Sequence, residues 1–128
     1  MIDPALVLVV DDDDSTREML TMALLDEGYR VEAAFDGDAA LARIDARRPD
    51  LVLMDVRMPG LSGEELLQLL RERHPGLPVV LTSADPRLVH DATARGAAGV
   101  LVKPFDLDDL LVVVERALAG PDLTAVGD

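Results

Sequence analysis

The chain has 128 residues, and its 25 acidic side chains outnumber 12 basic ones, for a formal net charge of −13. Nucleic-acid phosphates and anionic membranes repel such a chain, and 2% aromatic residues are too few for a base-stacking surface. The absence of cysteine excludes disulfides and thiolate chemistry, and no apolar run approaches the roughly 20 residues of a membrane span. We therefore expect a cytoplasmic protein that contacts neither nucleic acid nor membrane directly.

Five short apolar runs alternate with segments of helical periodicity. The runs cover residues 5–10, 29–34, 51–54, 77–81 and 99–102. Four of them are almost continuously apolar, which is typical of parallel strands covered on both faces, whereas the second alternates and suits an edge strand. This alternation predicts an α/β fold of five βα units, with a five-stranded parallel sheet between two layers of helices. At this length one domain is expected, and we place it at residues 1–119 with a mobile C-terminal tail at 120–128.

Helix boundaries are marked by short polar motifs and by glycine. Residues 15–18 (Ser-Thr-Arg-Glu) and 62–65 (Ser-Gly-Glu-Glu) are typical of capping boxes. The remaining helix starts are predicted from single aspartates, and the helix ends from single glycines. These residues are Asp36, Asp85 (followed by Pro86) and Asp106 at the starts, and Gly28, Gly76, Gly96 and Gly120 at the ends.

Polar side chains follow four of the five predicted strands. Asp11 to Asp14 follow the first, Asp55 the third, Thr82 and Ser83 the fourth, and Lys103 the fifth. Lys103 is the only lysine in the chain, since the other 11 basic residues are arginines. Binding sites of open α/β sheets form at the carboxyl ends of the strands, so we expect these groups to converge.

The predicted cluster suits a divalent cation. Asp13 and Asp14 are accounted for by a helix start, which favours acids. Asp11 and Asp12, however, continue an apolar strand directly into the predicted site, where close like charges need a counter-ion. Oxygen ligands of this kind suit Mg²⁺, with Mn²⁺ as the alternative ion.

Asp55 has the surroundings of a nucleophile. A carboxylate beside a divalent cation and a lysine can attack phosphorus and form an aspartyl phosphate. The cation and Lys103 would neutralise charge on the transferring phosphoryl group, and the Thr82 hydroxyl would hydrogen-bond one of its oxygens.

The chain resembles the receiver domain of two-component response regulators from about Leu6 to Leu118. The resemblance rests on four motifs, each at its own strand end. They are Val-Val-Asp-Asp at 9–12, Met-Asp-Val-Arg-Met-Pro-Gly at 54–60 with Gly63, Leu-Thr-Ser at 81–83, and Val-Lys-Pro-Phe at 102–105. It implies a flavodoxin-like three-layer sandwich with strand order 2-1-3-4-5.

The resemblance also implies a role for each matching residue. Asp55 is the expected phosphoacceptor, and Thr82 and Lys103 are expected to contact the phosphoryl group. The Lys103–Pro104 bond is expected to be cis. The expected ligands of Mg²⁺ are Asp12, Asp55, the backbone carbonyl of Arg57, and Asp11 through a water molecule. Ser83 matches a position kept small to admit the phosphodonor, and Arg57 and Ala84 match positions that tune dephosphorylation.

One position departs from the family pattern. Receivers usually carry Tyr or Phe three residues before the lysine, where this chain has Val100. An aromatic switch is therefore absent, while Thr82 and Ser83 remain. We expect activation to proceed through the Thr82 loop and the backbone of the fourth helix, or through a changed oligomer.

The partners implied are a histidine kinase or phosphotransfer protein as donor, and a downstream target or a second copy of the chain as recipient of the signal. The fourth helix, fifth strand and fifth helix form the expected contact surface. In the fifth helix, residues 107, 110, 111, 114, 117 and 118 form a predicted buried stripe, which leaves Val112 and Val113 outside it, on or near the solvent side. His74 and His90 are expected to be surface residues, so the donor histidine comes from another protein.

Two other function classes compete with this interpretation. A haloacid-dehalogenase-type phosphohydrolase would need a second aspartate two residues after Asp55, where this chain has Arg57. A flavodoxin-like nucleotide-binding module would need a phosphate loop after the first strand, where four acids would repel a phosphate. We expect no enzymatic turnover beyond self-phosphorylation and autodephosphorylation. The sequence leaves open whether the chain acts alone or as the receiver of a longer regulator.

Overall fold

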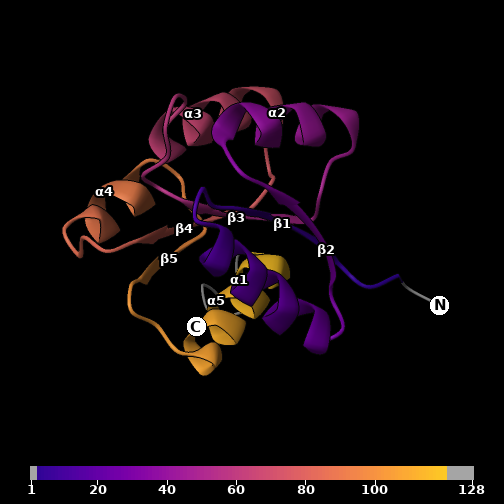
Figure 1. Ribbon diagram of the computed structural model, residues 1–128. Helices are drawn as coiled ribbons and strands as arrows, with labels where there is room; N and C mark the ends of the chain where they lie inside the picture. The colour runs from indigo at the N-terminus through magenta and orange to yellow at the C-terminus, as the bar shows by residue number, and fades with distance from the viewer. Residues whose placement is uncertain (1–2, 121–128) are drawn as a thin grey trace, which may run out of the picture.

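The computed structural model of the chain describes residues 3–120, apart from the side chains at positions 89 and 90. It contains one five-stranded parallel sheet of order β2-β1-β3-β4-β5, which confirms the predicted α/β fold and its edge strand (Figure 1). The strands are β1 (Leu6–Val10), β2 (Arg30–Ala34), β3 (Leu51–Asp55), β4 (Val79–Ser83) and β5 (Gly99–Val102). The helices are α1 (Asp14–Asp26), α2 (Gly37–Ala46), α3 (Gly63–Arg73), α4 (Leu88–Ala94) and α5 (Leu107–Ala119).

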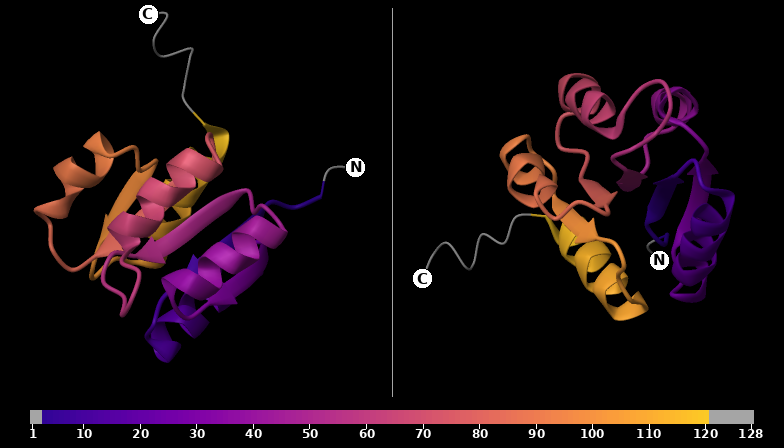
Figure 2. Two further views of the ribbon diagram at one scale, coloured as in Figure 1. Left: turned by 90° about the horizontal axis from the view of Figure 1, so that it is seen from above. Right: turned by 60° about the vertical axis from the view of Figure 1, so that its left-hand side comes forward.

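The helices form one layer on each face of the sheet. Helices α1 and α5 cover one face, and α2, α3 and α4 cover the other (Figures 1 and 2). All of β1 is buried because alternate residues point into different cores: Val7 and Val9 join α1 and α5, whereas Leu8 and Val10 join the opposite helices. The continuous apolar runs of β1, β3 and β4 therefore correspond to strands buried on both faces. The fifth run is equally apolar, but β5 lies at the other edge of the sheet and is only partly buried, so full burial was wrongly predicted for it.

Two helices begin at residues other than those predicted. The side chain of Asp13 accepts a hydrogen bond from the Thr16 amide, so α1 begins at Asp14 and the capping box predicted at Ser15 is wrong. Helix α4 begins at Leu88, because Asp85 accepts a hydrogen bond from the Arg87 amide in a turn that precedes the helix. The other predicted starts are confirmed, with capping boxes at Ser62 and Asp106 and a cap at Asp36, and all four predicted terminal glycines have positive φ.

The exposure of α5 corrects two further predictions. Leu107 is 51% exposed rather than buried, because it is the first residue of the helix and precedes the turn that packs on the sheet. Val113 is only partly exposed: it packs against the core on the α1–α5 face, near Gly99, so it contributes less to the solvent side than predicted. Val112 is 45% exposed, as predicted. The predicted mobile tail at 120–128 lies outside the described residues except for Gly120. Among the helices described here, none is long and apolar enough to cross a membrane.

Candidate functional site

Parallel pairing brings the polar strand ends to one edge of the sheet. Asp55 at the end of β3 is in register with Thr82 on β4, and Ser83 is in register with Val102 on β5. Two backbone hydrogen bonds continue this register past the strands, from the Val56 amide to the Thr82 carbonyl (3.0 Å) and from the Lys103 amide to the Ser83 carbonyl (2.7 Å). The sheet itself therefore positions the side chains of the site.

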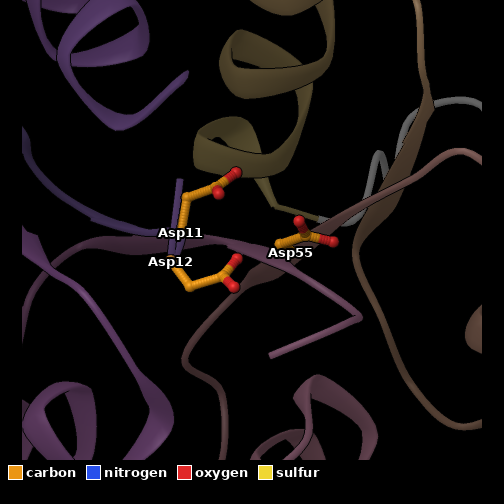
Figure 3. Close-up of side chains that lie close together, drawn as sticks. All are labelled: Asp11, Asp12 and Asp55. Atoms are coloured by element: carbon orange, nitrogen blue, oxygen red, sulfur yellow. The ribbon is translucent and has the colours of Figure 1, made fainter. Parts of the chain in front are cut away.

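Three carboxylates converge at this edge. Asp11, Asp12 and Asp55 each offer an oxygen, and these oxygens all lie within 4.8 Å of one another (Figure 3). Asp11 is buried, Asp55 is half-buried and Asp12 is exposed, so the cluster opens toward solvent on one side. Such a group of carboxylates repels itself unless a cation lies among them.

Asp11 is the buried member of the cluster, with 1% exposure. Its Oδ1 accepts a hydrogen bond from the Asp13 amide at 2.9 Å, and its Oδ2 has no hydrogen-bond partner. Lys103 Nζ lies 3.6 Å from Oδ2, which is an ion-pair distance and too long for a hydrogen bond. Burial raises the pKa of Asp11, and the neighbouring carboxylates add to this effect.

Lys103 supplies the positive charge of the site. Its Nζ donates a hydrogen bond to Asp55 Oδ2 at 3.1 Å. Burial lowers the pKa of Lys103, but the hydrogen bond to Asp55 and the charges of Asp55 and Asp11 outweigh burial, so the pKa is raised. The other oxygen of Asp55 accepts a hydrogen bond from the Arg57 amide at 3.1 Å. Lys103 is therefore fully protonated at neutral pH and placed against Asp55.

The donor set fits a hard divalent cation. The three carboxylates carry three negative charges and Lys103 returns one, so a divalent ion would leave the site neutral. The unpartnered Asp11 Oδ2 is the kind of buried oxygen that an ion or its bound water satisfies. Thr82 Oγ1 is likewise buried without a hydrogen-bond partner, so its hydroxyl is free to bind a ligand at this edge.

A cleft beside the carboxylates gives access to the site. It has a volume of about 530 Å³ and lies between the β1, β3 and β4 ends, where its lining includes Asp12, Arg57, Met58 and Asp85. A larger hollow of about 1050 Å³ lies at the opposite, amino-terminal ends of the strands, far from these groups. The size of a hollow therefore does not mark the site, whereas the convergence of charge does.

The remaining predicted residues lie around this centre. Ser83 is buried, and its hydroxyl accepts a hydrogen bond from the Asp85 amide at 3.0 Å. Val100 is partly buried and packs against the core on the α2–α3–α4 face. The peptide bond between Lys103 and Pro104 is cis. His74 ends α3 and pairs with Asp45, at 2.9 Å from Nε2 to Oδ1, which agrees with a structural role. The His90 side chain lies outside the described residues.

Sequence reasoning missed one residue of this region. Arg17 of α1 folds back and donates a hydrogen bond from a guanidinium nitrogen to the carbonyl oxygen of Asp11 at 2.8 Å. A signal was present in the sequence, because a cation in the first turn of a helix is unfavourable to the helix dipole and needs another reason to be there.

A family model describes the response regulator receiver domain, and it matches residues 7–115. The chain therefore belongs to the response regulator receiver domain family. Receiver domains bind Mg²⁺ through an acidic pocket, and they interact with histidine kinases and downstream effector domains. The order of the strands and the acidic edge described above agree with this membership.

Known relatives carry this domain in longer proteins. Over 116 residues the chain is 40% identical to the DNA-binding transcriptional regulator NtrC of Salmonella typhimurium, an alignment that covers 89% of this chain and 25% of that protein. Over 126 residues it is 39% identical to the probable transcriptional regulatory protein TcrX of Mycobacterium tuberculosis, covering 96% of this chain and 53% of TcrX. The chain thus spans between a quarter and about half the length of these relatives.

Solved structures of isolated receivers are similar over almost their whole length. The receiver domain of NtrX from Brucella abortus superimposes with a TM-score of 0.85 at 41% identity, covering 90% of this chain and 99% of that domain. The chemotaxis response regulator CheY4 of Vibrio cholerae gives a TM-score of 0.83 at 37% identity, with coverages of 89% and 98%.

Proposed function

We propose that Asp55 accepts a phosphoryl group from a phosphohistidine of a histidine kinase or phosphotransfer protein. The observation that carries this proposal is the position of Asp55, which shares one edge of the sheet with two further carboxylates and has Lys103 Nζ at 3.1 Å. A carboxylate with this cation beside it can approach a phosphorylated donor with less electrostatic repulsion.

The same edge would hold Mg²⁺. We propose Asp12 and Asp55 as direct ligands, the backbone carbonyl of Arg57 as a third, and Asp11 as a ligand through water. When bound, the ion supplies positive charge that neutralises phosphoryl oxygens during transfer. The open side of the cluster, at the exposed Asp12, leaves room for the water molecules that Mg²⁺ retains.

The proposed transfer forms one bond to phosphorus and breaks one. An oxygen of Asp55 forms a bond to phosphorus while the bond from phosphorus to the donor nitrogen breaks, and the released imidazole takes a proton from solvent. The buried Thr82 hydroxyl donates a hydrogen bond to one phosphoryl oxygen, which satisfies a group that has no partner in the free protein. Lys103 pairs with another oxygen of the transferred group, where its compact charge suits phosphate.

Acetyl phosphate labelling tests the proposal. Wild type incubated with acetyl phosphate and Mg²⁺ is expected to gain the mass of one phosphoryl group, read by intact-protein mass spectrometry. Asp55→Asn, and wild type in excess EDTA, are expected to gain nothing. Equal labelling of wild type and Asp55→Asn would contradict the assignment of Asp55. Hydrolysis of small phosphoesters with turnover would instead favour the phosphohydrolase alternative.

The signal would leave through α4, β5 and α5, toward a target protein or a second copy of the chain. Val112 supports this surface because it is exposed on α5, whereas Val113 is packed against the core and contributes less.

With Val100 in place of an aromatic residue, we propose that Thr82 and Ser83 move the following loop and the α4 backbone when phosphate binds. A phosphorylation-dependent change in elution volume on gel filtration would assign the output to self-association. The cytoplasmic location remains a prediction.

A further inference from the structure

Arg17 is an arginine in an unusual place. It lies in the first turn of α1, yet its side chain is only 21% exposed and bends back over the helix start. One guanidinium nitrogen donates to the carbonyl oxygen of Asp11 at 2.8 Å, and another contacts the carboxylate of Asp14. Asp14 is 90% exposed, and exposed ion pairs contribute little to stability, so the contact with the Asp11 carbonyl is the one that needs an explanation.

The contact completes the hydrogen bonding around Asp11. The Asp11 amide donates to the Ala34 carbonyl at 3.2 Å, its Oδ1 accepts from the Asp13 amide at 2.9 Å, and its carbonyl accepts from Arg17. Only Oδ2 is left without a hydrogen bond, and it lies on the side of Lys103 and the other carboxylates. Every other polar atom of Asp11 is therefore committed to holding the residue in place.

The Asp11 carbonyl also belongs to the peptide unit that joins Asp11 to Asp12. Because a peptide unit is planar, fixing this oxygen fixes the orientation of the link between the two aspartates. We propose that Arg17 is a positioning residue for the cation site: by holding the Asp11 carbonyl, it aims the carboxylates of Asp11 and Asp12 at the ion. This inference rests on the metal site of the proposed function.

Charge and geometry predict opposite effects for the loss of Arg17. If the guanidinium acted only through its charge, it would repel a nearby cation, so its removal would tighten cation binding. If it acts by holding the Asp11 carbonyl, its removal loosens the aspartates and weakens binding. Loss of a residue that orients metal ligands typically lowers metal affinity by about 10- to 100-fold. The sign of the change therefore distinguishes the two roles.

The test measures binding of Mn²⁺ alone to the full unphosphorylated chain, with free ion counted by electron paramagnetic resonance. Arg17→Met keeps the aliphatic length without a donor, and we expect it to weaken Mn²⁺ binding by about tenfold. Arg17→Lys, which retains a donor nitrogen and the positive charge, is expected to recover most of the affinity. Asp14→Ala is the matched control, since it removes the other partner of Arg17 and leaves the Asp11 carbonyl contact, and it is expected to bind almost as wild type does.

A second measurement excludes a merely structural effect. Phosphorylation of Arg17→Met by acetyl phosphate is expected to need more Mg²⁺ for half-maximal rate, while the maximal rate at saturating Mg²⁺ stays close to that of wild type. If Arg17→Met fails to fold, as judged by circular dichroism, Arg17→Leu, which also lacks a donor, replaces it with the same expectations.

Binding by Arg17→Met that equals or exceeds wild-type binding would overturn the positioning role and leave the metal site intact. A wild type that binds no Mn²⁺ would overturn both. Because the binding measurement uses no phosphodonor, it is independent of whether Asp55 is phosphorylated.

Discussion

Replacing Asp11 by asparagine separates the cation-binding role of the acidic edge from its effect on folding. Asp11 is 1% exposed, its Oδ2 lacks a hydrogen bond, and the carboxylates of Asp12 and Asp55 are its neighbours. A buried polar group without a partner costs about 1–3 kcal/mol, and a charged one costs more. Asparagine keeps the oxygen that accepts from the Asp13 amide and removes the charge. In excess EDTA at pH 7, we expect Asp11→Asn to raise the free energy of unfolding by about 1–2 kcal/mol.

Magnesium is expected to reverse this order. At about 100 times its dissociation constant, a ligand that binds only the folded state stabilises it by about 2.7 kcal/mol. Wild type should gain this stability, whereas Asp11→Asn, which lacks one of the proposed ligands, should gain much less. Urea unfolding followed by far-ultraviolet circular dichroism, with and without Mg²⁺, measures both effects. A variant less stable than wild type in EDTA would refute the reasoning, and so would a wild type that Mg²⁺ does not stabilise.

The pH dependence in EDTA follows from the raised pKa of Asp11. The folded protein holds this proton more tightly than the unfolded chain does, so the destabilisation is complete above the raised pKa and disappears below the usual carboxyl pKa of about 4. The stability advantage of Asp11→Asn over wild type should therefore shrink as the pH falls toward 4. An advantage that grows with falling pH would contradict the assignment.

Three further perturbations test other parts of the account. A Cβ on Gly63 would lie 2.7 Å from backbone atoms at the end of β3, so Gly63→Ala should lose about 1–3 kcal/mol in urea unfolding, whereas Gly99→Ala, which meets a side-chain methyl at 2.9 Å, should lose less; equal losses would refute this. Hydrogen bonding to His74 lowers the pKa of Asp45, so the stability that the ionised Asp45 contributes is present above about pH 4 and is lost as the pH falls through the lowered pKa. Asp45→Asn should therefore lose more unfolding free energy, relative to wild type, at pH 6 than at pH 3. An equal loss at both pH values would count against this assignment. Lys103→Arg should slow labelling by acetyl phosphate by about tenfold or more, since a guanidinium replaces a compact ammonium, and an unchanged rate would show that only charge matters.

The fold was predictable because the spacing of apolar residues within most strands reflects how deeply each strand is buried. Three near-continuous apolar runs correspond to the buried central strands β1, β3 and β4, and the more polar second run is the edge strand β2. The fifth run is as apolar as the central ones although β5 is the other edge strand, so its pattern did not reveal its position. The site followed from the same pattern, since Asp55, Thr82 and Lys103 each stand at or beside a strand end, and parallel pairing brings such ends together.

The errors arose where two local solutions compete. Both Asp13 and Ser15 are good helix caps, and only the folded turn decides between them: the amide of Thr16 binds Asp13, so the helix has already begun at Ser15. In α5, helical periodicity places Val113 outside the main stripe, but the small Gly99 on β5 leaves space that its side chain fills. The periodicity of a helix does not show which side chains of a neighbouring strand are small enough to leave space for it.

Arg17 could not be placed from spacing for a related reason. Its hydrogen bond is to a backbone carbonyl, and every residue has one, so no partner residue type appears in the sequence. A side-chain pair such as Lys103 with Asp55 shows two complementary residue types in the sequence, one in each motif. A side chain that binds a backbone carbonyl shows only its own residue type.

The location of the phosphoryl group is the most direct test of the account. After phosphorylation of wild type by acetyl phosphate with Mg²⁺, reduction by borohydride converts an aspartyl phosphate to homoserine, which peptide mass spectrometry locates along the chain. Homoserine is expected at position 55 alone, with none when Mg²⁺ is removed by EDTA. Homoserine at Asp11 or Asp12, or a phosphoryl group on His74 or His90, would contradict it.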